Sequence, residues 1–300
     1  MKLLITGATG LIGKELLDQC AEDGIPVHFL TTRKNQLNSS PNAKGFHWNP
    51  KTGEIDTAAF NGITSIINLA GAPVSRRWTA SYKKLIRDSR IDSIRLLRDT
   101  LQQIEHSISH FVSASGISYY PSSLSEEYSE SHPTPGTAFL AGVTVDWETE
   151  ADAIGQLGIK VSKLRTGIVL SEKGGALLKM VKPIKMGMGA PLGSGKQWQS
   201  WIDVTDMAAM YLHICRNELE GTFNAVAPNP ITNAELTKAI ASALGKRVWL
   251  PNVPAFVLKL VLGEMGSLVL ESQKVSCQKI QDSGFEFTYP TITESIGDLL

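Results

Sequence analysis

The residues whose type and spacing most clearly imply chemistry are Gly7, Gly10 and Gly13, close to the amino terminus. They follow the short apolar stretch Lys2 to Thr6, and apolar residues then recur at helical spacing through Leu11 to Glu22. At such a strand-to-helix junction, a glycine turn brings backbone N–H groups at the helix start close to a pyrophosphate, and the last glycine lets the helix pack on the strand. The arrangement predicts a bound dinucleotide rather than an ordinary structural turn.

The end of the second expected strand distinguishes NAD from NADP. An acidic side chain at about 20 residues after the glycines would bind the adenosine ribose hydroxyls of NAD. Here the strand Val27 to Thr31 runs into Thr32, Arg33 and Lys34, which offer hydroxyl and cationic donors suited to a 2′-phosphate. We therefore predict NADP (NADPH) in preference to NAD. The alternative is that Arg33 and Lys34 are solvated loop charges.

The composition is that of an ordinary globular protein. The 29 basic and 29 acidic residues of the 300-residue chain give a formal net charge of zero, which argues against nucleic acid or an anionic membrane as a partner. The three cysteines are widely spaced and form no C-x-x-C pair, which predicts free thiols in a reducing compartment. No long apolar signal segment precedes the first strand, so we expect a cytoplasmic protein.

Two other site motifs fail on their residue types. His106 and His110 have i, i+4 spacing but no third ligand, so we predict no metal site. The stretch Gly193 to Gln197 resembles part of a phosphate-binding P-loop, but Gln197 stands where a Ser or Thr is required. The glycine turn near the amino terminus is therefore the better-supported ligand-binding motif.

Strand and helix patterns alternate through the first half of the chain. This order predicts an α/β fold with a Rossmann-type doubly wound parallel sheet. Residues 1–170 are expected to form the NADP-binding core. Residues 171–300 are expected mainly to form a smaller C-terminal α/β substrate lobe and lid, with about 201–226 returning to the core. The further elements expected in the core are strands at Thr64 to Leu69, His110 to Ser113 and Lys160 to Leu164, and helices at Ser81 to Ile104 and near Val145 to Leu157.

The second half has a less regular pattern. Residues 171–201 are rich in Gly, Met, Lys and Pro, which is typical of a lid or substrate wall. Short strands are expected at Thr222 to Val226, Arg247 to Leu250 and Phe285 to Tyr289. The apolar window Pro254 to Leu270 is short and interrupted by charges, so it predicts a buried or docking helix rather than a membrane span.

Motifs along nearly the whole chain resemble the extended short-chain dehydrogenase/reductase family. More specifically, the chain resembles an atypical branch that carries epimerase names and is sometimes labelled as cell-division inhibitor homologues. The shared stretches include GATGLIG at Gly7 to Gly13, NLAG at Asn68 to Gly71, HFVSAS at His110 to Ser115, LRTGIVL at Leu164 to Leu170 and WIDVTDMA at Trp201 to Ala208; those of the branch include AGAPVSRRWT at Ala70 to Thr79, SRI at Ser89 to Ile91 and YYP at Tyr119 to Pro121. The resemblance implies cofactor contacts from Gly7, Thr9, Gly10, Leu11, Ile12, Gly13, Arg33, Leu69, Ala70 and Gly71.

The sequence departs from that family where the catalytic pair should be. Family members use a Tyr and a Lys four residues later, but no tyrosine of this chain has a lysine at i+4. By pattern, Leu140 stands at the Tyr position, Thr144 at the Lys position, and Arg90 at the position of a helix Asn. The remaining catalytic candidates are Ser113 or Ser115, which follow the family's serine, and Tyr120, with Tyr119 beside it, as a substitute acid. Tyr120 can equally be a packed aromatic near the cofactor.

The candidates for substrate binding combine cations with tryptophans. Arg76 and Arg77 suit an anionic or planar ligand, or else form salt bridges at a helix start. Trp198 and Trp201 suit a stacking wall, although Trp201 is as plausible as an interior anchor. Arg90 is the third arginine that we expect to bind the substrate. We expect an oxidoreductase or a nucleotide-sugar-epimerase-like enzyme on a small polar substrate, as a monomer or homodimer; the alternative is a non-catalytic NADP(H)-sensing regulatory protein.

Overall fold

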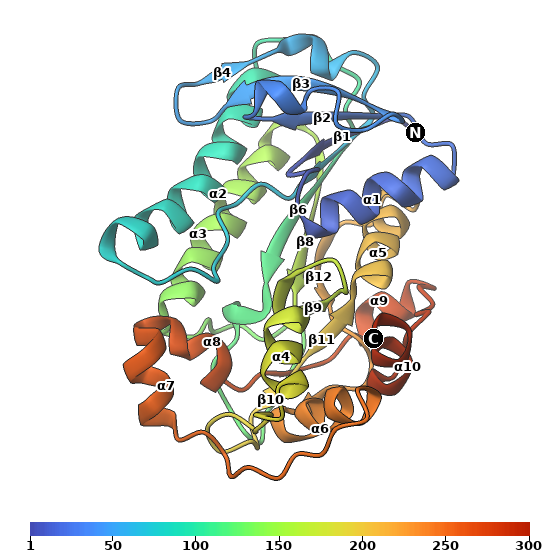
Figure 1. The fold of residues 1–300 in the computed structure, drawn as a ribbon. Helices are drawn as coiled ribbons and strands as arrows, with labels where there is room; N and C mark the ends of the chain where they lie inside the picture. Colours follow the sequence, from blue (N-terminus) through green and yellow to red (C-terminus); the bar gives the residue numbers. More distant parts are fainter.

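A computed structural model describes all residues, 1–300. Its centre is an eight-stranded sheet with the order β12-β8-β6-β5-β1-β2-β3-β4, in which β4 alone is antiparallel to its neighbour (Figure 1). The chain moves outward from β1 in both directions, so the carboxyl ends of β1 and β5 form the crevice where ligands bind in such sheets. The strands are β1 Leu3–Thr6, β2 Val27–Thr31, β3 Ala43–Asn49, β4 Glu54–Ile55, β5 Ser65–Asn68, β6 His110–Gly116, β8 Lys160–Thr166 and β12 Gly221–Ala225.

Helices cover both faces of the sheet (Figure 1). Strand side chains alternate between the faces, so Leu3 and Ile5 pack with the apolar residues of α1 (Leu11–Glu22) and α5 (Val204–Arg216). Leu4 faces the other way, into the cluster formed with α2 (Ala80–Leu101) and α3 (Phe139–Asp152). The sheet is therefore buried on both sides, as a parallel sheet requires. This confirms the predicted fold class.

A smaller apolar core lies below the sheet in the view of Figure 1. Its centre is Trp201, which is fully buried. Around it pack α4 (Gly175–Lys185), α6 (Asn233–Ala243) and α10 (Ile292–Leu299). The strands of this part are β9 Ile168–Leu170 paired with β11 Trp201–Asp203, and β10 Trp198–Gln199 paired with β13 Ile231–Thr232.

The carboxyl-terminal segment returns toward α2 and α3. Met265 and Leu268 pack against the apolar cluster that contains Phe139 and Leu140 of α3. Lys83 of α2 forms an ion pair with Glu264. The elements of the segment are α7 Ala255–Leu262, η5 Gly263–Gly266, α8 Ser267–Leu270, β14 Lys274–Val275, which pairs with β7 Glu127–Tyr128, and α9 Gln278–Asp282; the remaining 3₁₀ turns of the chain are η1 Lys34–Gln36, η2 Thr57–Phe60, η3 Ile117–Tyr119 and η4 Ala153–Leu157.

Two expected strands are absent, because their backbones have other partners or none. Residues 285–289 form no strand: Thr288 and Tyr289 donate their N–H groups to the carboxylate of Asp206 at 2.8 and 2.9 Å. Residues 247–250 are also irregular, and Trp249 is exposed. The helix expected near 145–157 instead begins at Phe139 and ends at Asp152, followed by a 3₁₀ turn.

The apolar window 254–270 is divided between α7, a 3₁₀ turn and α8. Phe256 and Leu260 of α7 are largely exposed to solvent, so this helix is not buried. None of the helices is both long and apolar enough to cross a bilayer.

Candidate cofactor and active site

The glycine turn has the geometry that a pyrophosphate needs. Gly7 has a φ of +68°, and a side chain there would lie 2.8 Å from the Leu69 carbonyl oxygen. A Cβ on Gly13 would lie 2.4 Å from the Gly7 oxygen, so α1 can pack this closely on the turn only because residue 13 has no side chain. Gly10 caps α1 without any side-chain hydrogen bond, and the first turn of α1 contains no acidic residue. The N–H groups at the start of α1 are thus open to an anion, and the dinucleotide fits this cradle.

The segment after β5 is held beside the glycine turn by Thr6. The Thr6 hydroxyl donates to Asn68 Oδ1 at 2.7 Å and accepts the N–H groups of Leu69 and Ala70, both at 3.1 Å. The Thr6 hydroxyl therefore holds Leu69, Ala70 and Gly71 next to the glycine turn at Gly7 to Gly13, where the sequence predicts cofactor contacts.

The cations expected at the 2′-phosphate follow β2, the strand next to β1. Thr32, Arg33 and Lys34 are exposed, and the Arg33 N–H donates to Thr31 Oγ1 at 3.2 Å. Neither Arg33 nor Lys34 has a carboxylate within ion-pair distance. Both charges are therefore available to a ligand.

The loop 70–79 is fixed to α2 by side chains of the branch motifs. Ser89 accepts the Ala72 N–H at 2.8 Å, and Arg90 Nη1 donates to the Ala72 oxygen at 3.2 Å. Tyr82 donates its hydroxyl to Pro73 O at 2.6 Å. Two stretches that are separate in sequence, AGAPVSRRWT and SRI, are thus one hydrogen-bonded unit.

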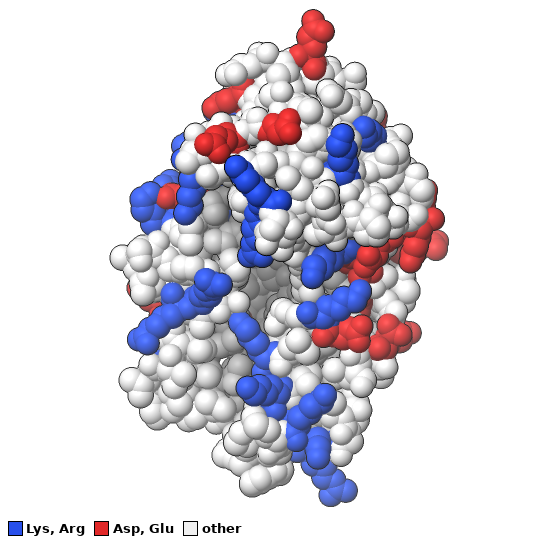
Figure 2. Space-filling model, turned by 45° about the horizontal axis from the view of Figure 1, so that its top comes forward, with Lys and Arg blue, Asp and Glu red and all other residues white.

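The tip of the same loop carries free cations. Arg76 and Arg77 are exposed and have no carboxylate partner. Lys179 of α4 reaches across to the Ser75 oxygen at 3.3 Å, so the lobe and the sheet half meet at this point. Figure 2 shows a hollow in the surface that is bordered largely by Lys and Arg side chains. Although the net charge of the chain is zero, Lys and Arg side chains gather around this hollow on the face that Figure 2 shows.

Leu140 and Thr144, which the sequence pattern assigns to the family's Tyr and Lys positions, are neither acid nor base. Leu140 lies in the apolar cluster with Trp78 and Leu268. The buried Thr144 hydroxyl donates to the Leu140 oxygen at 2.9 Å and lies 2.9 Å from Ser118 Oγ. Neither side chain is an ionisable group that replaces the missing pair.

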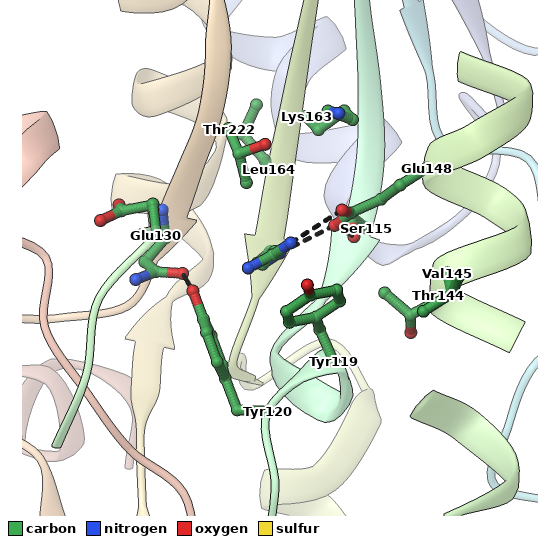
Figure 3. Close-up of polar contacts among 12 residues, drawn as sticks. Ser115, Tyr119, Tyr120, Glu130, Thr144, Val145, Glu148, Lys163, Leu164 and Thr222 are labelled. Carbon is green, nitrogen blue, oxygen red and sulfur yellow. Dashed lines mark hydrogen bonds and ion pairs between the residues drawn. The ribbon is translucent and has the colours of Figure 1, made fainter. Parts of the chain in front are cut away.

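A buried polar cluster lies instead at the carboxyl ends of β6 and β8 (Figure 3). Ser115 Oγ donates to Glu148 Oε1 at 2.6 Å, and Arg165 binds both oxygens of Glu148 at 2.8 Å. The three residues are 4%, 8% and 4% exposed, respectively. Burial alone would lower the pKa of Arg165, but its hydrogen bonds to Glu148 and the charge of that carboxylate outweigh burial and raise it. Ser113, the other serine candidate, is buried and donates to the Ala114 oxygen at 3.0 Å.

Two tyrosines pack around the guanidinium of Arg165. Its central carbon lies 3.4 Å from the ring centroid of Tyr119 and 5.0 Å from that of Tyr120. Tyr120 is 1% exposed, and its hydroxyl donates to Asn224 Oδ1 of β12 at 2.7 Å. Burial raises the pKa of Tyr120 to about 12. Figure 3 shows the phenol of Tyr120 pointing away from Ser115, and together with its bond to Asn224 this is the geometry of a packed aromatic.

Sequence reasoning missed Glu148 and Arg165. Glu148 is one of four acidic residues in α3, and Arg165 is one of three cations in β8, so neither residue stood out in its own stretch. Arg165 does lie in an interior strand, between β6 and β12. A buried charge in such a place requires a partner.

Both tryptophan candidates donate their indole N–H groups to backbone oxygens. Trp201 is fully buried and donates its indole N–H to the Asn229 oxygen at 3.0 Å, so it is an interior anchor. Trp198 donates to the Leu124 oxygen at 3.0 Å, and the ammonium of Lys274 lies 5.3 Å from its ring.

Comparisons with known proteins agree with this architecture. Residues 3–225 match the NAD dependent epimerase/dehydratase family, and residues 253–299 match a domain of unknown function (DUF1731). An epimerase family protein of Staphylococcus haemolyticus is 36% identical over 303 residues, covering 100% of this chain and 99% of that protein. A Staphylococcus aureus epimerase family protein is 35% identical over 300 residues, covering 99% and 98% of the two chains.

Solved structures extend the comparison. The crystal structure of human epimerase family protein SDR39U1 (isoform 2) with NADPH has a TM-score of 0.87 and 28% identity, covering 100% of this chain and 99% of that one. A nucleoside-diphosphate sugar epimerase from Corynebacterium glutamicum has a TM-score of 0.80 and 27% identity, and the match covers 100% of this chain and 58% of that one. The chain therefore belongs to the NAD dependent epimerase/dehydratase family, as an atypical short-chain dehydrogenase/reductase.

Proposed function

We propose that this chain is an NADP(H)-dependent oxidoreductase that acts on a small, polar, anionic substrate. The observation that carries the proposal is the pairing of an uncapped, glycine-lined start of α1 with unpaired Arg33 and Lys34 at the end of β2. A carboxylate at the end of β2 would repel a 2′-phosphate, whereas these cations attract it. The NADPH named with the human structure supports the same cofactor here.

We propose that Ser115 orients the substrate through a hydroxyl or amide beside the reacting carbon, and that water supplies the proton that completes the reduction. When bound, NADPH supplies a hydride to an electrophilic carbon. Ser115 gives its only proton to Glu148, so its oxygen remains free to accept a hydrogen bond from a hydroxyl or amide of the ligand. Glu148 keeps that hydroxyl oriented, and Arg165 keeps Glu148 oriented. Arg76 and Arg77, which are exposed in the loop after β5, and Lys179, which reaches Ser75 of that loop, supply positive charge to attract an anion.

The cofactor preference is tested by titration with NADPH and NADH, followed by tryptophan-to-nicotinamide energy transfer. Wild type should prefer NADPH, and Arg33→Ala should weaken NADPH binding by about tenfold because one charge-assisted contact is lost. NADH binding should be unchanged. Lys51→Ala, an exposed lysine in the turn between β3 and β4, is the matched control and should have no effect. Equal binding of both cofactors by wild type would contradict the NADP assignment.

A second candidate function is non-catalytic sensing of NADP(H), and Leu140 and Thr144 favour it because neither is an acid or base. The two functions are separated by following NADPH absorbance during incubation with a panel of carbonyl compounds that carry a carboxylate or phosphate. Consumption of NADPH that falls in Ser115→Ala, with cofactor binding retained, supports the oxidoreductase. Tight NADPH binding without consumption by any compound supports the sensor.

A further inference from the structure

Arg90 is a half-buried cation that has no carboxylate partner. Its Nη1 donates only to backbone oxygens, those of Ile86 at 2.8 Å and Ala72 at 3.2 Å. The guanidinium lies over the ring of Trp147, 4.9 Å from its centroid. Burial lowers the pKa of Arg90 to about 10, so the side chain remains charged at neutral pH. A positive charge in such surroundings is uncompensated by the protein itself.

Arg90 lies at the end of the site opposite the adenine side. A Cβ on Gly71 would lie 3.2 Å from the guanidinium carbon, so Arg90 packs directly under the loop that follows β5. The 2′-phosphate residues Thr32 to Lys34 follow β2, on the far side of β1. Because the dinucleotide extends across the crevice between β1 and β5, its nicotinamide end belongs to the side of β5 and β6.

The buried charged groups near Ser115 cancel one another. Glu148 and Arg165 form a bidentate pair, which leaves no net charge at Ser115. Thr144 is neutral at the position that the sequence pattern assigns to the family's lysine. Arg76 and Arg77 are exposed, so solvent screens their charges. Arg90 thus supplies the unpaired, half-buried positive charge next to the nicotinamide end.

We propose that Arg90 makes this site discriminate between the two redox states of the cofactor, so that the protein binds NADPH more tightly than NADP⁺. The inference rests on the proposed NADP(H) binding. The oxidised nicotinamide ring carries a positive charge that the reduced ring lacks, and a fixed cation nearby repels only the oxidised form. The protein therefore holds the cofactor as a hydride donor and favours release of NADP⁺ once the hydride has been transferred.

The test measures dissociation constants for NADPH and NADP⁺ by calorimetry, at one pH and ionic strength. Wild type should bind NADP⁺ on the order of tenfold more weakly than NADPH, the size expected for one charge roughly 12 Å from the ring at an effective dielectric constant of about 20. Arg90→Met should bring the ratio of the two constants close to one, and Arg90→Lys should restore much of it. Arg95→Met is the matched control, because Arg95 lies on the same helix and is paired with Glu150 at the surface.

The ratio separates this role from a merely structural one. Loosening of the loop after β5 would weaken both forms equally and leave the ratio unchanged. Equal affinities in wild type, or an unchanged ratio in folded Arg90→Met, would overturn the inference while NADP(H) binding stands. If Arg90→Met does not fold, the ratios of the two dissociation constants for wild type and Arg90→Lys still test the inference, which requires weaker binding of NADP⁺ than of NADPH in both proteins. Failure to bind either form would overturn the proposed function together with the inference.

Discussion

The two ends of the candidate site differ in whether backbone groups or side chains form them. The adenine and pyrophosphate end is mostly backbone: a glycine turn, the uncapped start of α1 and the segment after β5. The end near Ser115 is made of side chains, namely Glu148, Arg165 and Arg90, drawn from two helices and a strand. The backbone end requires that residues such as Gly7 and Gly13 have no side chain. The side-chain end requires that each charged or polar group has its hydrogen-bonding partner, as Glu148 has in Ser115 and Arg165. The two ends should therefore respond differently to mutation.

The largest effect is expected from breaking the pair at the side-chain end. Arg165→Met should lower the free energy of unfolding by about 3–5 kcal/mol, because Glu148 would remain buried without its cation. The side chains of the pair are 5% and 9% exposed, so solvent screens it little. The double variant Glu148→Leu/Arg165→Met should recover most of the loss, since well-packed apolar residues can replace a buried pair. Urea unfolding measures both. A loss below about 1 kcal/mol for the single variant would show that the pair behaves like a surface ion pair.

A smaller effect is expected at the backbone end, and no second substitution should repair it. Gly13→Ala places a Cβ 2.4 Å from the Gly7 oxygen and 2.5 Å from the Ala8 Cα, so α1 must move away from the turn. Such overpacking costs about 1–3 kcal/mol. Because the cradle is displaced with the helix, NADPH affinity should fall by roughly 10- to 100-fold.

The matched control for this substitution is Gly142→Ala in α3, where a Cβ meets nothing within 4 Å. It should leave binding unchanged and raise stability by roughly 0.5–1 kcal/mol through helix propensity. Both readouts come from one NADPH titration and one urea curve per variant. Unchanged NADPH affinity in Gly13→Ala would mean that the cradle does not depend on this close approach.

The same difference explains what could be predicted from sequence. Glycine spacing and apolar periodicity are local, so α1 and β2 have the bounds that the sequence predicts. The cluster at Ser115 depends on contacts between residues 33 and 17 positions apart, Ser115 with Glu148 and Glu148 with Arg165. No local pattern specifies such a pairing. The strand predicted at residues 285–289 was wrong for a related reason. Their alternation of apolar and polar residues resembles that of a strand, but the N–H groups of Thr288 and Tyr289 bond the side chain of Asp206.

The smallest effect is expected for Tyr120, which the sequence offered as a substitute acid. Tyr120→Phe removes the hydrogen bond to Asn224 and leaves its buried amide oxygen without that donor, which should cost about 1–3 kcal/mol of stability. The amide nitrogen of Asn224 keeps its own bond to the Ser276 oxygen. NADPH affinity should not change, because the phenol is bonded to Asn224 of β12, at the edge of the sheet away from β1 and its glycine turn. Turnover, where a substrate is found, should persist, since a phenol with its pKa raised to about 12 and its proton already donated is poorly suited to protonating a substrate. Loss of turnover with folding and NADPH binding intact would instead place Tyr120 in the proton path, and the side-chain end of the site would then extend beyond Ser115 to β12.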